Sequence, residues 1–335
     1  MTSNIRRRLI VVVSGFALFA LAVMAWAPTV GSTSISLSRA FDSSIPWSDN
    51  VDAQIFFVAR LPRVLAGGLI GASLAAAGVV LQAMLRNPLA TPFTLGVSAG
   101  AALGAMLAIA FGLDVGAMGV SSVPIASFIG SLVAIAIVYW LATSQKRGLS
   151  TNVLLLAGVT LNSFFSALIL FVQYLADFAE SFRTLRWLMG DLDVGSYGPI
   201  LAALPFIVMA FVVFAALPRT LNLLTMGDDV AAARGVEVIQ AQRWAFLSAS
   251  LATGAAVSLG GPVGFIGIVV PHLVRLMVGS DHRLVLPAAT LFGAAFLVLC
   301  DLGARTIMAP LEIPVGIITA LIGGPFFLWL LVKKS

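Results

Sequence analysis

The sequence feature that most constrains the fold of this chain is a series of long apolar runs separated by short polar segments. A helix needs about 20 consecutive apolar residues to cross the hydrocarbon core of a bilayer, and about ten segments of that kind follow one another along the 335 residues. They are 9–27, 64–85, 93–111, 123–143, 153–175, 200–217, 244–259, 263–278, 285–302 and 314–332. Backbone polar groups find no water in lipid, so such segments must be helical. The sequence predicts an all-α, polytopic membrane helix bundle with about ten transmembrane helices.

Composition supports this fold class over a water-soluble one. The chain is 60% hydrophobic and 10% charged, whereas charged residues make up about 25% of an ordinary soluble domain. The first run follows Arg6, Arg7 and Arg8 and ends in Ala25-Trp26-Ala27. This small-x-small pattern is similar to a signal-peptide cleavage site. The run is longer than the 7–15 or so apolar residues of a signal peptide. We therefore predict an uncleaved first membrane helix.

Charge placement predicts the orientation. Ten spans put both termini on one side of the membrane, and the loops on that side carry 13 of the 19 basic residues: Arg6, Arg7, Arg8, Arg86, Lys146, Arg147, Arg219, Arg234, Arg243, Arg275, Arg283, Lys333 and Lys334. By the positive-inside rule this side is cytoplasmic. We expect one transmembrane domain over 1–335 in the inner membrane, with both termini in the cytoplasm and 219–243 as the longest cytoplasmic segment.

Missing motifs narrow the function. No GxxxxGK[ST] loop is present, so the chain does not bind ATP through that motif. Asp301 is the only carboxylate inside a span and lies near its outer end, whereas proton-coupled carriers keep ionisable relays in mid-membrane. This argues against a secondary transporter, which stays as the alternative. His272 and His282 are too few for a His-rich metal site, and Cys300 reads as a small buried hydrophobe.

Two loop regions carry unusual features. Within 219–243, residues 227–235 read as a short helix, with acids at its start, an arginine near its end and glycine after it. Such a helix could dock into a cytoplasmic partner or be a solvated linker. On the outer side, Arg60, Arg63 and Arg305 run against the charge bias, which suits either an acidic partner or snorkelling to headgroups.

Collinear motifs give the chain a family resemblance. They are Arg60-Leu61-Pro62-Arg63, Asn87-Pro88-Leu89-Ala90 with Leu95-Gly96-Val97-Ser98-Ala99-Gly100, Leu154-Leu155-Leu156-Ala157-Gly158-Val159, Gly261-Pro262-Val263-Gly264-Phe265-Ile266-Gly267 with Pro271-His272-Leu273-Val274-Arg275, and Pro314-Val315-Gly316 with Gly323-Gly324-Pro325-Phe326-Phe327. Together they resemble the permease subunit of type II ABC importers for iron siderophores, haem and cobalamin, the FecCD family. The resemblance covers almost the whole chain.

The resemblance implies partners and the absence of catalysis in this chain. It implies pairing with a second permease subunit, either an identical copy or a close homologue, with two ATP-binding cassette subunits below and a periplasmic substrate-binding protein above. ATP and magnesium would be bound by the partner ATPase, so the chain itself would hold no cofactor and no catalytic residue. Membrane lipid surrounds such a protein, and nucleic acid is not an expected partner.

The resemblance also assigns roles to residues. Arg60, Arg63 and Arg305 match arginines that engage acidic residues of the binding protein. Residues that match the region received by the ATPase are Gly227, Asp228, Asp229, Ala232, Arg234 and Gly235.

The same resemblance places cytoplasmic gates at four further positions. Asn87 and Leu89 form one group, and Thr151 and Asn152 form the other. Asn152 departs from the Thr-Ser pair that is common in the family, so its role is less well defined. The expected function is import of a metal chelate, a ferric siderophore first and haem or cobalamin next.

Overall fold

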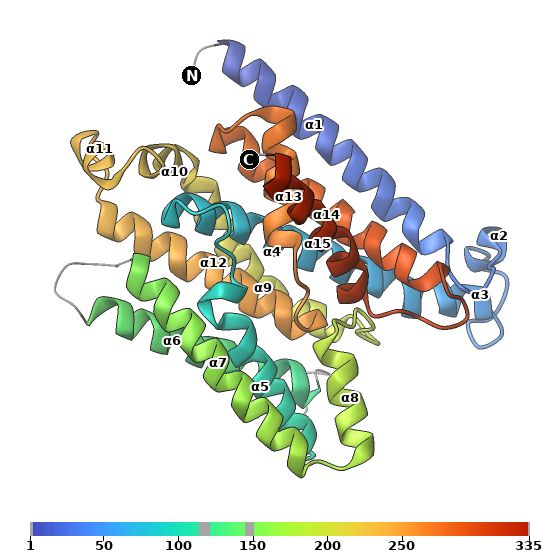
Figure 1. Ribbon diagram of the computed structural model, residues 1–335. Helices are drawn as coiled ribbons and strands as arrows, with labels where there is room; N and C mark the ends of the chain where they lie inside the picture. Colours follow the sequence, from blue (N-terminus) through green and yellow to red (C-terminus); the bar gives the residue numbers. More distant parts are fainter. Residues whose placement is uncertain (1–2, 114–120, 145–150, 334–335) are drawn as a thin grey trace.

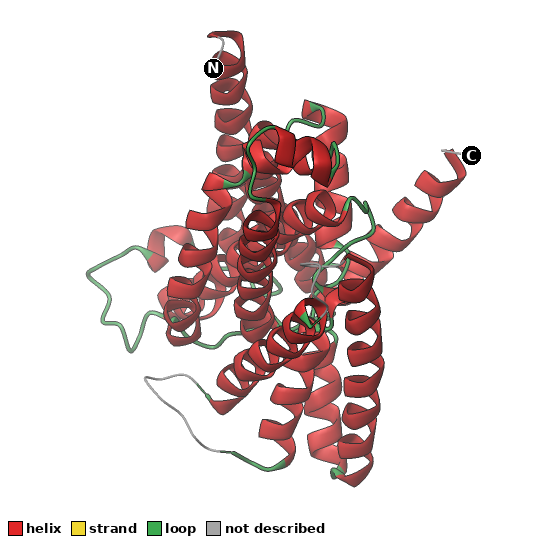
Figure 2. Ribbon diagram, turned by 90° about the vertical axis from the view of Figure 1, so that its left-hand side faces the viewer, coloured by secondary structure: helices red, strands yellow, loops and turns green. Residues whose placement is uncertain are grey.

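The computed structural model of the protein describes residues 3–113, 121–144 and 151–333. Within these ranges every regular element is a helix (Figures 1 and 2). The α-helices are α1 (Ser3–Trp26), α2 (Leu37–Ala40), α3 (Val51–Gln54), α4 (Leu61–Leu85), α5 (Val97–Ala110), α6 (Ser122–Thr143), α7 (Thr151–Leu175), α8 (Phe178–Leu188), α9 (Gly198–Ala216), α10 (Pro218–Leu224), α11 (Asp228–Ala233), α12 (Val238–Gly260), α13 (Ile266–Val278), α14 (His282–Thr306) and α15 (Val315–Lys333). The all-α fold class is confirmed.

Each of the predicted spans contains a helix. Six helical segments are long and apolar enough to cross a membrane, and α5, α13 and the apolar part of α15 are shorter. Residues Ile55–Arg60 are π-helical and join α3 to α4 in one continuous segment, Val51–Leu85. The seventh and eighth runs form a helix of 23 residues, α12, and a half-length helix of 13 residues, α13. The number of membrane crossings stays a prediction.

Helix α4 forms the centre of the bundle. It is largely buried, and it packs against α12, α13 and α14. Small residues let the backbones approach: a Cβ on Gly71 would lie 2.2 Å from the carbonyl oxygen of Gly293, and one on Gly78 would lie 2.2 Å from that of Gly267. In lipid, where helix association depends on close packing, such contacts hold a bundle together.

Contacts between loops define two ends of the bundle. At the end that we call the inner end, Arg8 donates to the carbonyl oxygen of Val278 (2.9 Å), and Arg86 pairs with Asp228 (3.3 Å). The beginning of α1, the end of α4, and α10 and α11 therefore lie together, as the upper part of Figure 1 shows. The opposite, outer end holds α2, α3, α8 and the loop before α15. The assignment of these two ends to the cytoplasmic and outer faces of the membrane stays a prediction.

A sharp break separates α12 from α13. Gly261 has a φ of 68°, and a Cβ there would lie 2.3 Å from the carbonyl oxygen of Trp187. Phe265, although not a glycine, has a φ of 67°. A left-handed backbone conformation is unfavourable for a large side chain and persists only where the surrounding packing holds it. The side chain of Phe265 packs against Gly323 of α15. Helix α13 thus begins inside the bundle, beside α4 and α15.

Candidate functional site

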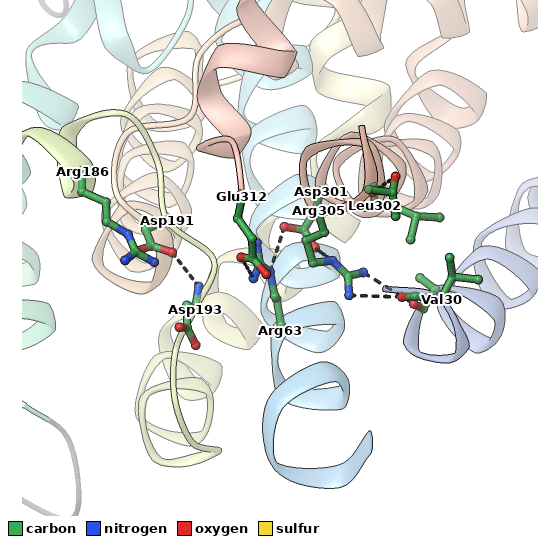
Figure 3. A network of polar contacts seen from close by, with 11 residues as sticks. Val30, Arg63, Arg186, Asp191, Asp193, Asp301, Leu302, Arg305 and Glu312 are labelled. Atoms are coloured by element: carbon green, nitrogen blue, oxygen red, sulfur yellow. Dashed lines mark hydrogen bonds and ion pairs between the residues drawn. The ribbon is translucent and has the colours of Figure 1, made fainter. Parts of the chain in front are cut away.

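Two of the three outer arginines, Arg63 and Arg305, meet at one buried carboxylate, that of Asp301 (Figure 3). Arg63, in the first turn of α4, places Nε 2.9 Å from Asp301 Oδ1, and Arg305, one turn after Asp301 on α14, places Nε 2.9 Å from Oδ2. Asp301 is 1% exposed. A buried carboxylate is stable only when it is paired and hydrogen-bonded; both guanidiniums pair with Asp301, and Arg63 also donates a hydrogen bond to it.

Arg60 and Arg305 are held by backbone carbonyls near the end of α1. Arg60 donates to the carbonyl oxygens of Pro28 (3.2 Å) and Thr33. Arg305 reaches those of Val30 (3.4 Å) and Ala27 (3.5 Å). Their exposed fractions are only 6% and 3%. Both guanidiniums are therefore engaged within the chain, and neither projects freely from the surface.

Arg63 has a second, more exposed partner. Glu312 lies in the loop before α15, and its Oε2 is 2.6 Å from Nη1 of Arg63. The Glu312 side chain is 38% exposed, so this ion pair borders solvent, unlike the one with Asp301. Arg63 therefore connects a buried charge to an accessible one.

A cavity of about 800 Å³ opens beside this cluster at the outer end. Four arginines and two acidic residues line it, together with apolar side chains of α8: the charged residues are Arg60, Arg63, Arg186, Arg305, Asp193 and Glu312. Arg63 and Arg305 are paired with Asp301, and Arg186 is paired with Asp191 (3.0 Å), so the solvent-bordering guanidinium of Arg63 is the group that this cavity offers to a carboxylate. Sequence reasoning did not identify Arg186 or Glu312, and it noted Asp301 only as an isolated acid, although its four-residue spacing from Arg305 was a usable signal.

Helix α11 occupies the predicted position at the inner end. It follows Gly227, which has a φ of 115°, and ends before Gly235, which has a φ of 82°. Ala231 is fully buried, whereas Asp229, Ala232 and Arg234 are exposed. One face of this short helix is thus fixed to the bundle, and the other is open to a partner.

The ion pair of Asp228 links α11 to the central helix. Asp228 Oδ2 lies 3.3 Å from Nη2 of Arg86, the residue that ends α4 in a left-handed conformation. Both side chains are about two-fifths exposed, 39% and 43%, so the pair contributes at most about 1 kcal/mol. Its value lies in connecting a surface helix to α4.

The four expected gate residues lie in two separate segments. Asn87 Oδ1 accepts from the backbone N–H of Leu89 (2.9 Å), which closes a turn after α4, and Leu89 is 46% exposed. Thr151 is the first residue of α7 and Asn152 is exposed; the Thr151 side chain lies outside the described part of the chain.

A buried polar link ties α4 to α13 near the inner end. Gln82 Nε2 donates to the carbonyl oxygen of Gly267 (2.8 Å), and Nη2 of Arg275 donates to Gln82 Oε1 (2.5 Å). Gln82 is 5% exposed, and sequence reasoning did not single it out. Among the described residues no group of three or more His, Cys, Asp or Glu side chains could hold a metal, and Cys300 is buried as expected.

Comparisons with known proteins place this architecture in one family. The model of the FecCD transport family matches residues 17–333. The chain is 38% identical over 323 residues to the hemin transport system permease protein HmuU of Yersinia pestis, covering 96% of this chain and 95% of that one. It is 45% identical over 280 residues to the cobalamin import system permease protein BtuC of Halobacterium salinarum, covering 82% of this chain and 73% of the relative.

A solved structure shares the fold over nearly its full length. It is described as an inward-facing conformation of a transporter assigned to the metal-chelate ABC type, with a TM-score of 0.82 and 32% sequence identity. The match covers 96% of this chain and 99% of the solved one. The family match, the curated relatives and the apolar helices lead to one assignment: the chain belongs to the FecCD transport family and is a multi-pass permease of the inner membrane.

Proposed function

We propose that the protein is the membrane-spanning subunit of an ATP-driven importer that carries a metal chelate into the cytoplasm. The observation that carries this proposal is the near full-length similarity to a hemin permease and to a transporter of the metal-chelate type. A ferric siderophore is our first candidate substrate, and haem or cobalamin the next. ATP and magnesium bind to two separate ATPase subunits, and a second permease subunit completes the pathway.

In this proposal the chain supplies a path and two coupling surfaces. The described residues place no charged group deep inside the bundle apart from the paired end networks, which favours passage of a bulky chelate over tight binding. Selectivity then rests on a periplasmic binding protein. ATP binding shifts the equilibrium between outward- and inward-facing states, because only a ligand that binds the two states differently can move such an equilibrium.

The binding protein is proposed to dock at the outer arginine cluster. A carboxylate of the partner can reach Arg63 by replacing Glu312, whose ion pair borders solvent. Arg60 and Arg305, engaged with backbone carbonyls, hold the wall of the cavity in place. Docking thus exchanges one carboxylate for another and frees the loop before α15.

This exchange gives a sharp docking experiment. Glu312→Gln removes the internal competitor, so the binding protein is expected to bind about two- to fivefold more tightly, as for an exposed ion pair. Asp193→Asn, which removes a charge from the same cavity without an ion pair to Arg63, is the matched control. Arg63→Gln, which leaves Asp301 paired with Arg305, is expected to weaken docking while the permease–ATPase complex stays assembled. Unchanged docking in the Arg63→Gln variant would contradict the assignment.

The ATPase is proposed to dock at α11. Its exposed residues Asp229, Ala232 and Arg234 form the contact, and the Asp228–Arg86 pair passes the movement to α4. Replacing 228–234 by a Gly/Ser stretch is expected to leave ATP hydrolysis active but to abolish its coupling to transport. Coupled transport that survives the replacement would place the docking surface elsewhere.

The gate and the driving force are tested by transport itself. We propose that Asn87, Leu89, Thr151 and Asn152 close the cytoplasmic end of the path. The purified complex in proteoliposomes should take up ferric siderophore, haem or cobalamin only with ATP and the binding protein. Uptake that continues without any ATPase subunit and collapses with an ion gradient would instead establish a secondary transporter.

A further inference from the structure

A second cavity of about 890 Å³ lies at the inner end, away from both coupling surfaces. Helix α14 forms its floor, the beginning of α1 forms one wall, and the end of α9 with the start of α10 forms the other. We call it the inner groove. Its residues are Leu9, Ile10, Val13, Ser14, Phe211, Phe214, Ala215, Ala216, Pro218, Arg219, Arg283, Leu286, Pro287, Thr290 and Leu291.

The interior of the inner groove is apolar. Leu9, Phe211 and Leu286 are representative of its lining, and the hydroxyl of Thr290 is already bonded to the carbonyl oxygen of Leu286 (2.9 Å). Apart from the hydroxyl of Ser14, a polar or charged ligand would find few partners along these walls and would lose its hydration there. A hydrocarbon chain is the ligand that such a lining accepts.

The groove mouth is cationic. Arg219 is exposed and makes no hydrogen bond or ion pair with any described residue. Arg283, by contrast, is paired with Asp281 (2.6 Å). The side-chain hydrogen bonds from Arg283 hold the pKa of Asp281 well below its usual range, so that pair is neutral overall at physiological pH. Arg219 therefore contributes an uncompensated positive charge where the apolar groove meets the interface.

The length of the groove fits one membrane leaflet. From Arg283 to Leu291, α14 advances eight residues, which is about 12 Å at the rise of an α-helix. A single leaflet contributes about 15 Å of hydrocarbon. The arginines therefore lie at headgroup level when the apolar walls reach into the acyl-chain region, and basic pockets between helices at the cytoplasmic surface suit anionic lipid headgroups.

We propose that the inner groove binds an anionic phospholipid, with its phosphate at Arg219 and an acyl chain lying along α14 between α1 and α9. Helix α1 leaves an open side for such a neighbour: it packs on α14 through Phe16 and Phe19 against Phe292, and only 17% of its apolar window is buried within the chain. The bound lipid fills the space between α1 and α9. This inference does not depend on the transported substrate.

Native mass spectrometry of the purified full-length chain tests the site. In a mild detergent, phosphatidylglycerol is titrated against phosphatidylcholine of the same chain length. Wild type is expected to bind at least one phosphatidylglycerol about fivefold more tightly than phosphatidylcholine, the fold-change that corresponds to about 1 kcal/mol for one basic residue near a membrane surface. Equal binding of the two lipids, or detergent that neither lipid displaces, would overturn the proposal.

Matched variants separate the headgroup from the chain. Arg219→Gln is expected to remove the preference for phosphatidylglycerol, and Arg219→Lys to retain it. Arg243→Gln is the control, since Arg243 is also exposed but lies on α12 outside the groove. Ala215→Phe narrows the groove and is expected to lower binding of both lipids, with monodispersity in size-exclusion chromatography as its folding check. Equal loss of preference in the Arg219→Gln and Arg243→Gln variants would show nonspecific surface charge only and refute the site.

Discussion

Removing the charge of Asp301 is expected to destabilise the protein strongly. Asp301→Asn keeps the size of the side chain but leaves Arg63 and Arg305, both at 2.9 Å, without their shared carboxylate. At 4 Å and an effective dielectric constant of 20, one such pair is worth about 4 kcal/mol before desolvation. Removing one partner of a buried pair costs about 3–5 kcal/mol. We expect a loss in that range for Asp301→Asn, because Glu312 compensates only Arg63.

The assay is equilibrium unfolding of the purified chain by SDS in mixed micelles, followed by tryptophan fluorescence. Glu312→Gln is the control, because its 38% exposed side chain forms a pair worth at most about 1 kcal/mol. A combined replacement of Arg63, Asp301 and Arg305 by Met, Leu and Met removes all three charges and should restore most of the stability, since none of these three residues then leaves a buried charge without its ionic partner. If Asp301→Asn costs no more than Glu312→Gln, the buried ion-pair argument is wrong.

Two further stability predictions use the same assay. Gly78→Ala should lower the free energy of unfolding by about 1–3 kcal/mol through overpacking, because the new Cβ would lie 2.2 Å from the carbonyl oxygen of Gly267. Gly15→Ala is the control: a Cβ there has nothing within 4 Å, so this variant should be neutral or stabilising. Equal effects of the two substitutions would refute the close contact at Gly78. Asp281→Ala should cost about 1–2 kcal/mol by removing the N-cap of α14. The folded-state pKa of Asp281 is lowered, chiefly by side-chain hydrogen bonds from Arg283, so its contribution is present above about pH 4 and lost as pH falls further. A difference between Asp281→Ala and wild type that persists unchanged at pH 3 would contradict this.

The first turns of two helices contain polar residues, so a search for apolar runs does not locate where these helices begin. Helix α12 starts at Val238, six residues before the apolar run at 244, and α8 lies in a segment with no apolar run of membrane length. A local signal for α8 was present: Asp177 caps the helix by accepting from the backbone N–H of Glu180 (2.8 Å). This aspartate–glutamate spacing is typical of a helix N-terminus. Such signals are short-range and could have been found without a structure.

The ion pairs at the outer end, around Arg63 and Asp301, could not be predicted from local sequence patterns. Arg63 and Asp301 are 238 positions apart in the chain, and only the packing of α4 on α14 brings them to 2.9 Å. From the sequence the arginines looked available to a partner. In the fold Arg60 and Arg305 are nearly fully buried, which leaves Arg63, through its exposed pair with Glu312, as the accessible member.

The sequence by itself determined the all-α membrane fold, the positions of the long helices, the short helix at 227–235 and the family. These follow from local quantities: apolar run length, the lack of water in lipid, caps and collinear motifs. Tertiary structure alone decided the half-length α13, the ion pairs around Asp301 and the inner groove between α1, α9 and α14. Each of these depends on helices distant in sequence that meet through close backbone packing, and no single segment encodes such a meeting.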